Sequence, residues 1–141
     1  RMENILTSTY SDGSKLNGVL SPYDGISRGI ISALTDAGYS VGAEWPIISG
    51  QDAEIDSVKA IVAGEQYATI FKDTRKLAEV AVDMASALLK GEEPEVNNTE
   101  DYDNGKKVVP SYLLESQIVV KDNIKEVLVD SGYWTEDEIN G

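Results

Sequence analysis

The most constraining feature of this sequence is a junction that occurs three times. A short apolar run ends at a polar residue followed by aspartate, and a helical pattern then begins, at Tyr23-Asp24, Gln51-Asp52 and Lys72-Asp73. Successive strand-to-helix junctions of this kind are typical of an α/β fold with a parallel sheet. Such sheets bind ligands outside the carboxyl ends of their strands, where these polar residues would lie. The pattern therefore favours a site for a small, hydroxyl-rich ligand.

The periodicity of apolar residues predicts where the elements lie. Strands are expected at residues 17–21, 45–49, 67–71 and 117–120. Helices are expected at residues 1–10, from Asp24 to about residue 37, from Asp52 to about residue 64, at residues 74–90, from Asn123 to about residue 129, and as one turn at residues 134–138. Short strands that alternate with helices predict right-handed βαβ units.

Composition excludes several classes of function. The 141 residues, about one domain's worth of chain, carry 25 acidic and 12 basic side chains, a formal net charge of −13, which argues against nucleic acid and anionic lipid as partners. Cysteine and histidine are both absent, which excludes thiol and Ser-His-Asp chemistry and most transition-metal sites. No phosphate-binding glycine loop is present either. We therefore expect neither an enzyme nor a cofactor or metal.

Each junction aspartate has two interpretations. As the first polar residue before a helix, Asp24, Asp52 or Asp73 would be an N-cap, and spacing alone favours this reading. Alternatively, the Asp52 carboxylate would accept two sugar hydroxyls. Gln51 and Tyr23 are uncommon N-caps, so the capping interpretation explains them less well. The Lys72 ammonium offers three hydrogen-bond donors toward the predicted crevice.

The two tryptophans differ in what the sequence says of them. Trp45 lies at the entry end of its strand, away from the predicted crevice, so it is a core residue rather than a platform for a sugar. The sequence does not place Trp134.

The junction segments resemble a known family. Ser21-Pro22-Tyr23-Asp24-Gly25, Gly50-Gln51-Asp52-Ala53 and Phe71-Lys72-Asp73, with residues 58–66 and 108–114, are similar to periplasmic sugar-binding proteins of ABC transporters. The similarity is greatest to the branch that binds multiple monosaccharides or xylose. Members have two Rossmann-like lobes that close over a sugar, and they are more than twice as long as this chain. The resemblance implies an incomplete C-terminal lobe of a type I periplasmic binding protein, a Rossmann-like parallel sheet with helices on both faces.

The resemblance also implies a division of the chain and a set of contacts. Residues 1–72 would belong to the C-terminal lobe, residues 73–107 would pack on an N-terminal lobe, and residues 108–141 would be the return segment and tail. The implied sugar-binding residues are Asp52, Lys72, Tyr23, Gln51 and Asp24. Of these, Asp52 matches a hydroxyl acceptor, Lys72 matches a donor of xylose binders, and Asp24 matches an aspartate of structural character. Tyr23 departs from the asparagine of many relatives.

The resulting prediction is the solute-binding component of an ABC sugar importer. Its partners would be a pentose or hexose and an ABC permease, and its location would be extracytoplasmic, either periplasmic or as a membrane-anchored lipoprotein. Two alternatives keep the fold, a sugar sensor that feeds a membrane histidine kinase and the effector-binding half of a LacI-type repressor. A flavodoxin-like enzyme is disfavoured by the missing phosphate loop. The apolar stripe from Leu77 to Leu88 predicts that residues 1–141 self-associate.

Overall fold

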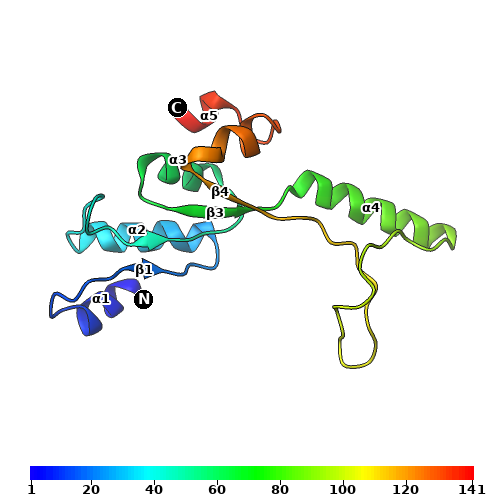
Figure 1. Cartoon of the computed structure of the whole chain (residues 1–141), viewed down its shortest axis with the longest axis horizontal. Helices are drawn as coiled ribbons and strands as arrows, with labels where there is room; N and C mark the ends of the chain where they lie inside the picture. The colour runs from blue at the N-terminus through cyan, green and yellow to red at the C-terminus, as the bar shows by residue number, and fades with distance from the viewer. The chain divides into compact units, whose positions relative to one another are not determined.

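The computed structural model describes all 141 residues, and the chain forms two compact units (Figure 1). Unit 1 contains Arg1–Phe71 and Gln117–Gly141, and unit 2 contains Lys72–Ser116. Residues 108–116 thus group with unit 2, and unit 1 resumes at Gln117.

Unit 1 holds most of the secondary structure. Its elements in chain order are α1 (Met2–Thr9), β1 (Gly18–Val19), α2 (Asp24–Asp36), β2 (Ile47–Ile48), α3 (Ile55–Ala63), β3 (Ala68–Phe71), β4 (Gln117–Val120), a 3-10 turn η1 (Lys121–Asn123), a π-helical turn η2 (Lys125–Val129) and α5 (Glu136–Asn140). The strands expected in unit 1 and the helices expected before β3 are all present, although β1 and β2 are shorter than predicted. The segment after Asn123 forms a π-helical turn rather than the expected α-helix, and the last helical turn is α5.

The strands of unit 1 form two two-stranded sheets that an isolated bridge links. β1 pairs with β2 in parallel, with Val19 opposite Ile48, and a parallel bridge between Gln51 and Ile70 joins the β2 segment to β3. β4 then pairs with β3 in antiparallel fashion, from Ala68 opposite Val120 to Phe71 opposite Gln117. The parallel pairing that the strand-to-helix junctions predict is present from β1 to β3, and β4, whose direction the junctions did not predict, is antiparallel. β4 pairs along the whole length of β3.

Two apolar clusters fill unit 1. The first lies between α1, α2 and β2, and its buried members are Leu6, Leu16, Ile30, Leu34 and Ile48. The second joins α3 and β3 to the C-terminal elements, and its buried members are Ala53, Val58, Ile61, Phe71, Val119, Ile124, Leu128 and Ile139. The half-buried Trp45 packs against the first cluster, as expected of a core residue. These clusters hold the strand ends, and the turns that follow them, in place.

The helix starts distinguish the three junction aspartates. Asp73 is the N-cap of α4 (Thr74–Lys90), and its carboxylate accepts a hydrogen bond from the Arg75 backbone N–H at 3.0 Å. The N-cap predictions for Asp24 and Asp52 are wrong. The caps of α2 and α3 are Tyr23 and Glu54, and neither cap residue bonds its helix through a side chain.

Unit 2 consists of α4 followed by an extended segment, residues 92–116. α4 ends at Gly91 in the left-handed conformation, φ 75°, as predicted. The segment is closed by Asn97, whose side chain exchanges two hydrogen bonds with the backbone of Leu113, at 2.7 and 2.9 Å.

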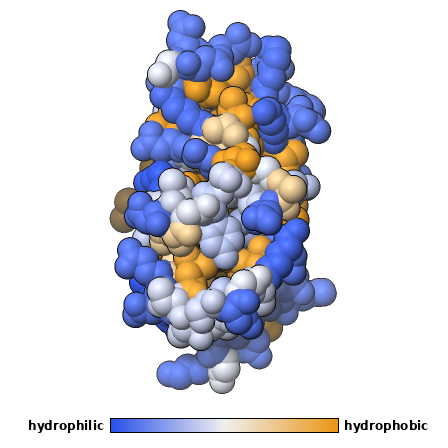
Figure 2. Space-filling view, turned by 90° about the vertical axis from the view of Figure 1, so that its left-hand side faces the viewer, coloured by the Kyte–Doolittle hydropathy of each residue, from blue (hydrophilic) through white to orange (hydrophobic).

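The face of the molecule in Figure 2 is mostly hydrophilic, with apolar side chains in separate patches. No helix has the combined length and apolarity needed to cross a bilayer.

Candidate functional site

The turn after β2, residues 50–54, has an unusual backbone conformation. Asp52 has φ 98° and Ala53 has φ 50°, so two successive residues other than glycine lie in the left-handed region. Such backbone costs about 1–3 kcal/mol per residue and persists only where the surroundings impose it. Strained positions of this kind cluster at ligand sites, which makes the turn the first candidate.

Hydrogen bonds hold this turn from several sides. The Gly50 carbonyl accepts from the Ile70 N–H at 3.1 Å, and the Asp52 N–H donates to the Ile70 carbonyl at 2.8 Å. The Ala53 N–H donates to Thr69 Oγ1 at 3.1 Å. The Ala53 carbonyl accepts from Trp134 Nε1 at 2.9 Å. The backbone of the turn is thus fixed by β3 and by the C-terminal segment together.

Asp24 is a buried organiser of the same turn. Its carboxylate is fully buried and accepts from the Glu54 N–H and the Gln66 amide, each at 2.9 Å. Thr69 Oγ1 lies 2.9 and 3.0 Å from the two carboxylate oxygens. Burial raises the pKa of the Asp24 carboxyl above its ordinary value, and the hydrogen bonds from Gln66, Glu54 and Thr69 oppose this rise. These bonds occupy the carboxylate inside unit 1.

Two glycines allow this close packing. A Cβ on Gly50 would overlap the Asp24 carboxylate and the Gln66 amide. A Cβ on Gly25 would lie 2.6 Å from the ring of Tyr23, so the exposed phenol rests against the start of α2. Glycine at these positions lets the carboxylate and the phenol approach the backbone.

The structure brings four of the five predicted site residues to adjacent turns of unit 1. The Asp24 N–H donates to the Gln51 carbonyl at 3.0 Å, which joins the turn after β1 to the turn after β2. Gln51 and Asp52 are half-buried and Tyr23 is exposed. Lys72 follows Phe71 at the end of β3 and is the first residue of unit 2. These residues offer different polar groups: a phenol on Tyr23, an amide on Gln51, a carboxylate on Asp52 and an ammonium on Lys72. Together they are the donors and acceptors that hydroxyl groups require.

Several supporting residues escaped the sequence reasoning. Thr69 and Gln66 complete the network around Asp24, and Gln66 Oε1 is buried without a partner. A threonine in the otherwise apolar run of β3 is a signal that could have found the first. No local signal points to Trp134, which is separated from Ala53 by 81 positions. No group of acidic residues is arranged to hold a metal ion.

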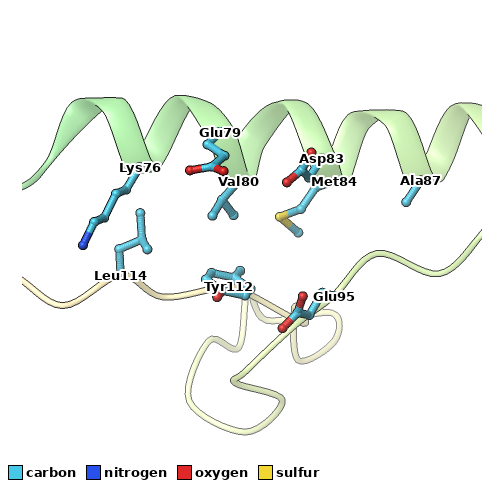
Figure 3. A pocket seen from close by; sticks show the side chains of 9 residues that line it. All are labelled: Lys76, Glu79, Val80, Asp83, Met84, Ala87, Glu95, Tyr112 and Leu114. Atoms are coloured by element: carbon cyan, nitrogen blue, oxygen red, sulfur yellow. The ribbon is translucent and has the colours of Figure 1, made fainter.

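Unit 2 carries a separate groove of about 510 Å³ between α4 and the extended segment of residues 92–116 (Figure 3). Val80 and Met84 of α4 face Tyr112 and Leu114, and the charged residues at this groove are Lys76, Glu79, Asp83 and Glu95. None of the predicted sugar-binding residues lines it.

Sequence comparisons place these features among known proteins. Residues 1–93 match the family model of the periplasmic binding protein domain. The chain is 55% identical over 140 residues to the multiple sugar-binding periplasmic receptor ChvE of Rhizobium radiobacter, an alignment that covers 99% of this chain and 39% of that protein. It is 38% identical over 138 residues to the D-xylose-binding periplasmic protein of Escherichia coli (strain K12), covering 98% of this chain and 39% of the relative. The chain thus spans about two fifths of the length of these relatives.

Solved structures of solute-binding proteins also superpose on this chain, again over about two fifths of their own length. An ABC transporter solute-binding protein from Clostridium phytofermentans with bound β-D-glucose superposes with a TM-score of 0.87 at 48% identity, covering 99% of this chain and 42% of the other. A carbohydrate transporter solute-binding protein from Chloroflexus aurantiacus, in complex with D-glucose, superposes with a TM-score of 0.85 at 36% identity, covering 97% of this chain and 39% of the other.

Proposed function

The chain belongs to the periplasmic binding protein family, and from this premise we propose that it forms part of the solute-binding component of an ABC sugar importer. Its relatives are sugar-binding receptors rather than enzymes, and they are periplasmic. This location favours the importer over a LacI-type repressor. The ligand is a monosaccharide, held without catalysis between this chain's lobe and a second lobe. An ABC permease is the partner that receives it, and the location is extracytoplasmic, as a periplasmic protein or a membrane-anchored lipoprotein.

The observation that carries this proposal is the conformation of Asp52. Its left-handed backbone is imposed by bonds from β3 at the carboxyl end of β2, where ligands of α/β sheets bind. A carboxylate held there accepts two hydroxyl hydrogens of a pyranose. Gln51 and Tyr23 on adjacent turns add an amide and a phenol, and Lys72 adds donors. Hydrogen bonds to charged groups contribute ~1.5–3 kcal/mol each, which makes Asp52 and Lys72 the strongest contacts.

Two further assignments follow from the resemblance to two-lobe binding proteins. Residues 1–72 form part of the C-terminal lobe, and residues 73–107 pack on the N-terminal lobe. Where that lobe is absent, the exposed apolar face of α4 drives self-association of residues 1–141.

Replacement of Asp52 in the full-length protein tests the proposal. Asp52→Ala should weaken binding of D-glucose or D-xylose by ~2–4 kcal/mol, roughly 30- to 1,000-fold, because sugar hydroxyls lose their charged acceptor in a closed cleft. Isothermal titration calorimetry measures the change. Asp52→Asn, which tolerates the left-handed backbone, should give an intermediate loss and controls for folding.

Asp56→Ala is the matched control, since Asp56 is an exposed aspartate on the neighbouring α3. It should leave sugar affinity unchanged. If Asp52→Ala and Asp56→Ala have equal affinity for both sugars, Asp52 does not contact the sugar. If the unmodified protein binds none of the monosaccharides tested, the proposed function itself fails.

A further inference from the structure

Tyr133 and Trp134 lie next to both strand ends that carry proposed sugar contacts. Trp134 donates its indole N–H to the carbonyl of Ala53, the residue after Asp52, at 2.9 Å. The Tyr133 ring meets the ring of Phe71, the residue before Lys72, edge to face, with centroids 4.7 Å apart. Two consecutive residues near the end of the chain thus touch the neighbours of two proposed contacts.

The pair is itself firmly placed. The backbone N–H groups of Tyr133 and Trp134 both donate to the carbonyl of Leu128, at 2.9 and 3.1 Å, and Leu128 is fully buried. Gly132, at φ 67°, supplies the left-handed turn that brings them there. The two rings also meet each other edge to face, with centroids 5.4 Å apart. The indole is therefore placed by its own backbone bonds and by packing on the second apolar cluster, in addition to its bond to the turn.

This bond acts where the backbone is strained. Ala53 is fully buried, and its left-handed conformation has to be maintained by partners. On one side the Ala53 N–H bonds Thr69, and on the other side its carbonyl bonds Trp134. Loss of the indole N–H would leave a carbonyl in a buried residue without that partner, which favours relaxation of the turn and displacement of Asp52.

We propose that Trp134 is a positioning residue for the sugar site, which fixes the Asp52–Ala53 turn through the Ala53 carbonyl, and that Tyr133 supports it against Phe71. This inference rests on the proposed function of Asp52 as a sugar contact. Trp134 does not contact the sugar. It makes the C-terminal segment part of the binding machinery, although that segment lies far from the site in sequence.

The molecule offers a matched control for the test. Trp45 also donates its indole N–H to a backbone carbonyl, that of Glu65, at 2.7 Å, and it is also half-buried. It precedes β2, whereas Asp52 follows β2. Trp134→Phe and Trp45→Phe therefore remove the same kind of bond at opposite ends of one strand.

In the full-length protein, Trp134→Phe should weaken binding of D-glucose or D-xylose roughly 3- to 10-fold, the range of one net hydrogen bond, and Trp45→Phe less than about 2-fold. Calorimetry measures the affinities, and urea unfolding measures the stability of each variant. Should Trp134→Phe fail to fold, benzothienylalanine at position 134 keeps the shape of the indole and lacks only the N–H.

Amide hydrogen exchange without sugar separates this inference from the proposed function. Exchange at Ala53 and Glu54 should accelerate in Trp134→Phe and remain unchanged in Trp45→Phe. Faster exchange together with weaker binding supports the proposal, and if no sugar binds at all, the proposed function fails while exchange still reports on the turn. Equal losses of affinity in the two variants, or unchanged exchange at Ala53, would overturn it, as would faster exchange with full affinity.

Discussion

The two longest helices of the chain, α2 in unit 1 and α4 in unit 2, are both amphipathic but differ in what holds them. α2 buries five side chains, among them Leu34, which has no exposed surface. α4 is longer, with 17 residues, yet none of its side chains is buried. Its apolar residues Leu77, Val82, Leu88 and Leu89 are 55–89% exposed. Hydrophobic packing thus holds α2, whereas α4 is defined by capping residues at its two ends.

This difference shows that an amphipathic pattern specifies a helix without specifying its partner. The stripe of α4 has the same spacing as the stripe of α2, but only α2 buries side chains against a core, whereas Val80 and Met84 of α4 line an open groove opposite the segment of residues 92–116. The ends of α4 are set instead by the Asp73 cap and by Gly91. Such local interactions contribute about 1 kcal/mol each, compared with several for a buried side chain.

Truncation of one leucine in each helix should give the largest difference. Leu34→Ala is expected to lower the free energy of unfolding of unit 1 by about 3 kcal/mol, because it removes a buried side chain and leaves a cavity. Leu88→Ala, at a position 64% exposed, should change the stability of the monomer of residues 1–141, studied at a concentration too low for self-association, by less than about 0.5 kcal/mol. Both tryptophans lie in unit 1, so urea unfolding followed by fluorescence reports Leu34→Ala, and amide exchange across α4 reports Leu88→Ala.

A large cost at Leu88 in the monomer would contradict the contrast between the helices. At higher concentration the proposed self-association should cover the apolar stripe of α4. Light scattering should then reveal a dimer that Leu88→Ala weakens.

The buried carboxylate of unit 1 should give a smaller effect with a defined pH dependence. Asp24→Asn is expected to destabilise unit 1 by about 2 kcal/mol, because an amide cannot accept from the Glu54 N–H, the Gln66 amide and the Thr69 hydroxyl together. Burial raises the pKa of Asp24 in the folded state, so the native state holds this proton more tightly than the unfolded chain does. The contribution of Asp24 is therefore fully present below the unfolded pKa of about 4, and it declines as the pH rises through the folded pKa.

Urea unfolding between pH 3.5 and 7 checks this sign. The stability gap between the unmodified chain and Asp24→Asn should narrow as the pH rises. Asp36→Asn, at the exposed last position of α2, controls for the loss of one charge. A gap that widens with pH would mean that the charged form of Asp24 is the favoured one in the fold.

The difference between local interactions and packing with distant residues also explains how much could be predicted from sequence. The bounds of α4, the Asp73 cap and the order of β1, α2, β2, α3 and β3 follow from local spacing, and each was predicted. The antiparallel direction of β4 and the internal role of Asp24 depend on residues distant in sequence. Asp24 reads locally as a cap, but its partners are Glu54, Gln66 and Thr69. Trp134 could not be placed because its partner, Ala53, lies 81 positions away.

The smallest expected effect concerns the cap of α4, and its pH dependence should have the opposite sign. The Arg75 side chain, which meets the Asp73 carboxylate at 2.8 and 2.9 Å, holds the pKa of Asp73 to about 2, and burial opposes this only in part. Because the pKa is lowered, the contribution is fully present above about pH 4 and is lost as the pH falls toward 2. Asp73→Ala should cost α4 about 1 kcal/mol at pH 7, with a discount for the half-exposed Arg75.

Amide exchange in the first turns of α4 measures this cost. The gap between the unmodified chain and Asp73→Ala should close between about pH 4 and 2. Asp73→Ser keeps a capping oxygen without the charge, so it should retain most of the protection at pH 7 and show no change in this range. Asp83→Ala removes an exposed carboxylate from the middle of the same helix and controls for net charge. Equal protection in Asp73→Ala and Asp83→Ala would mean that the start of α4 is held by tertiary contacts, and the contrast with α2 would then disappear.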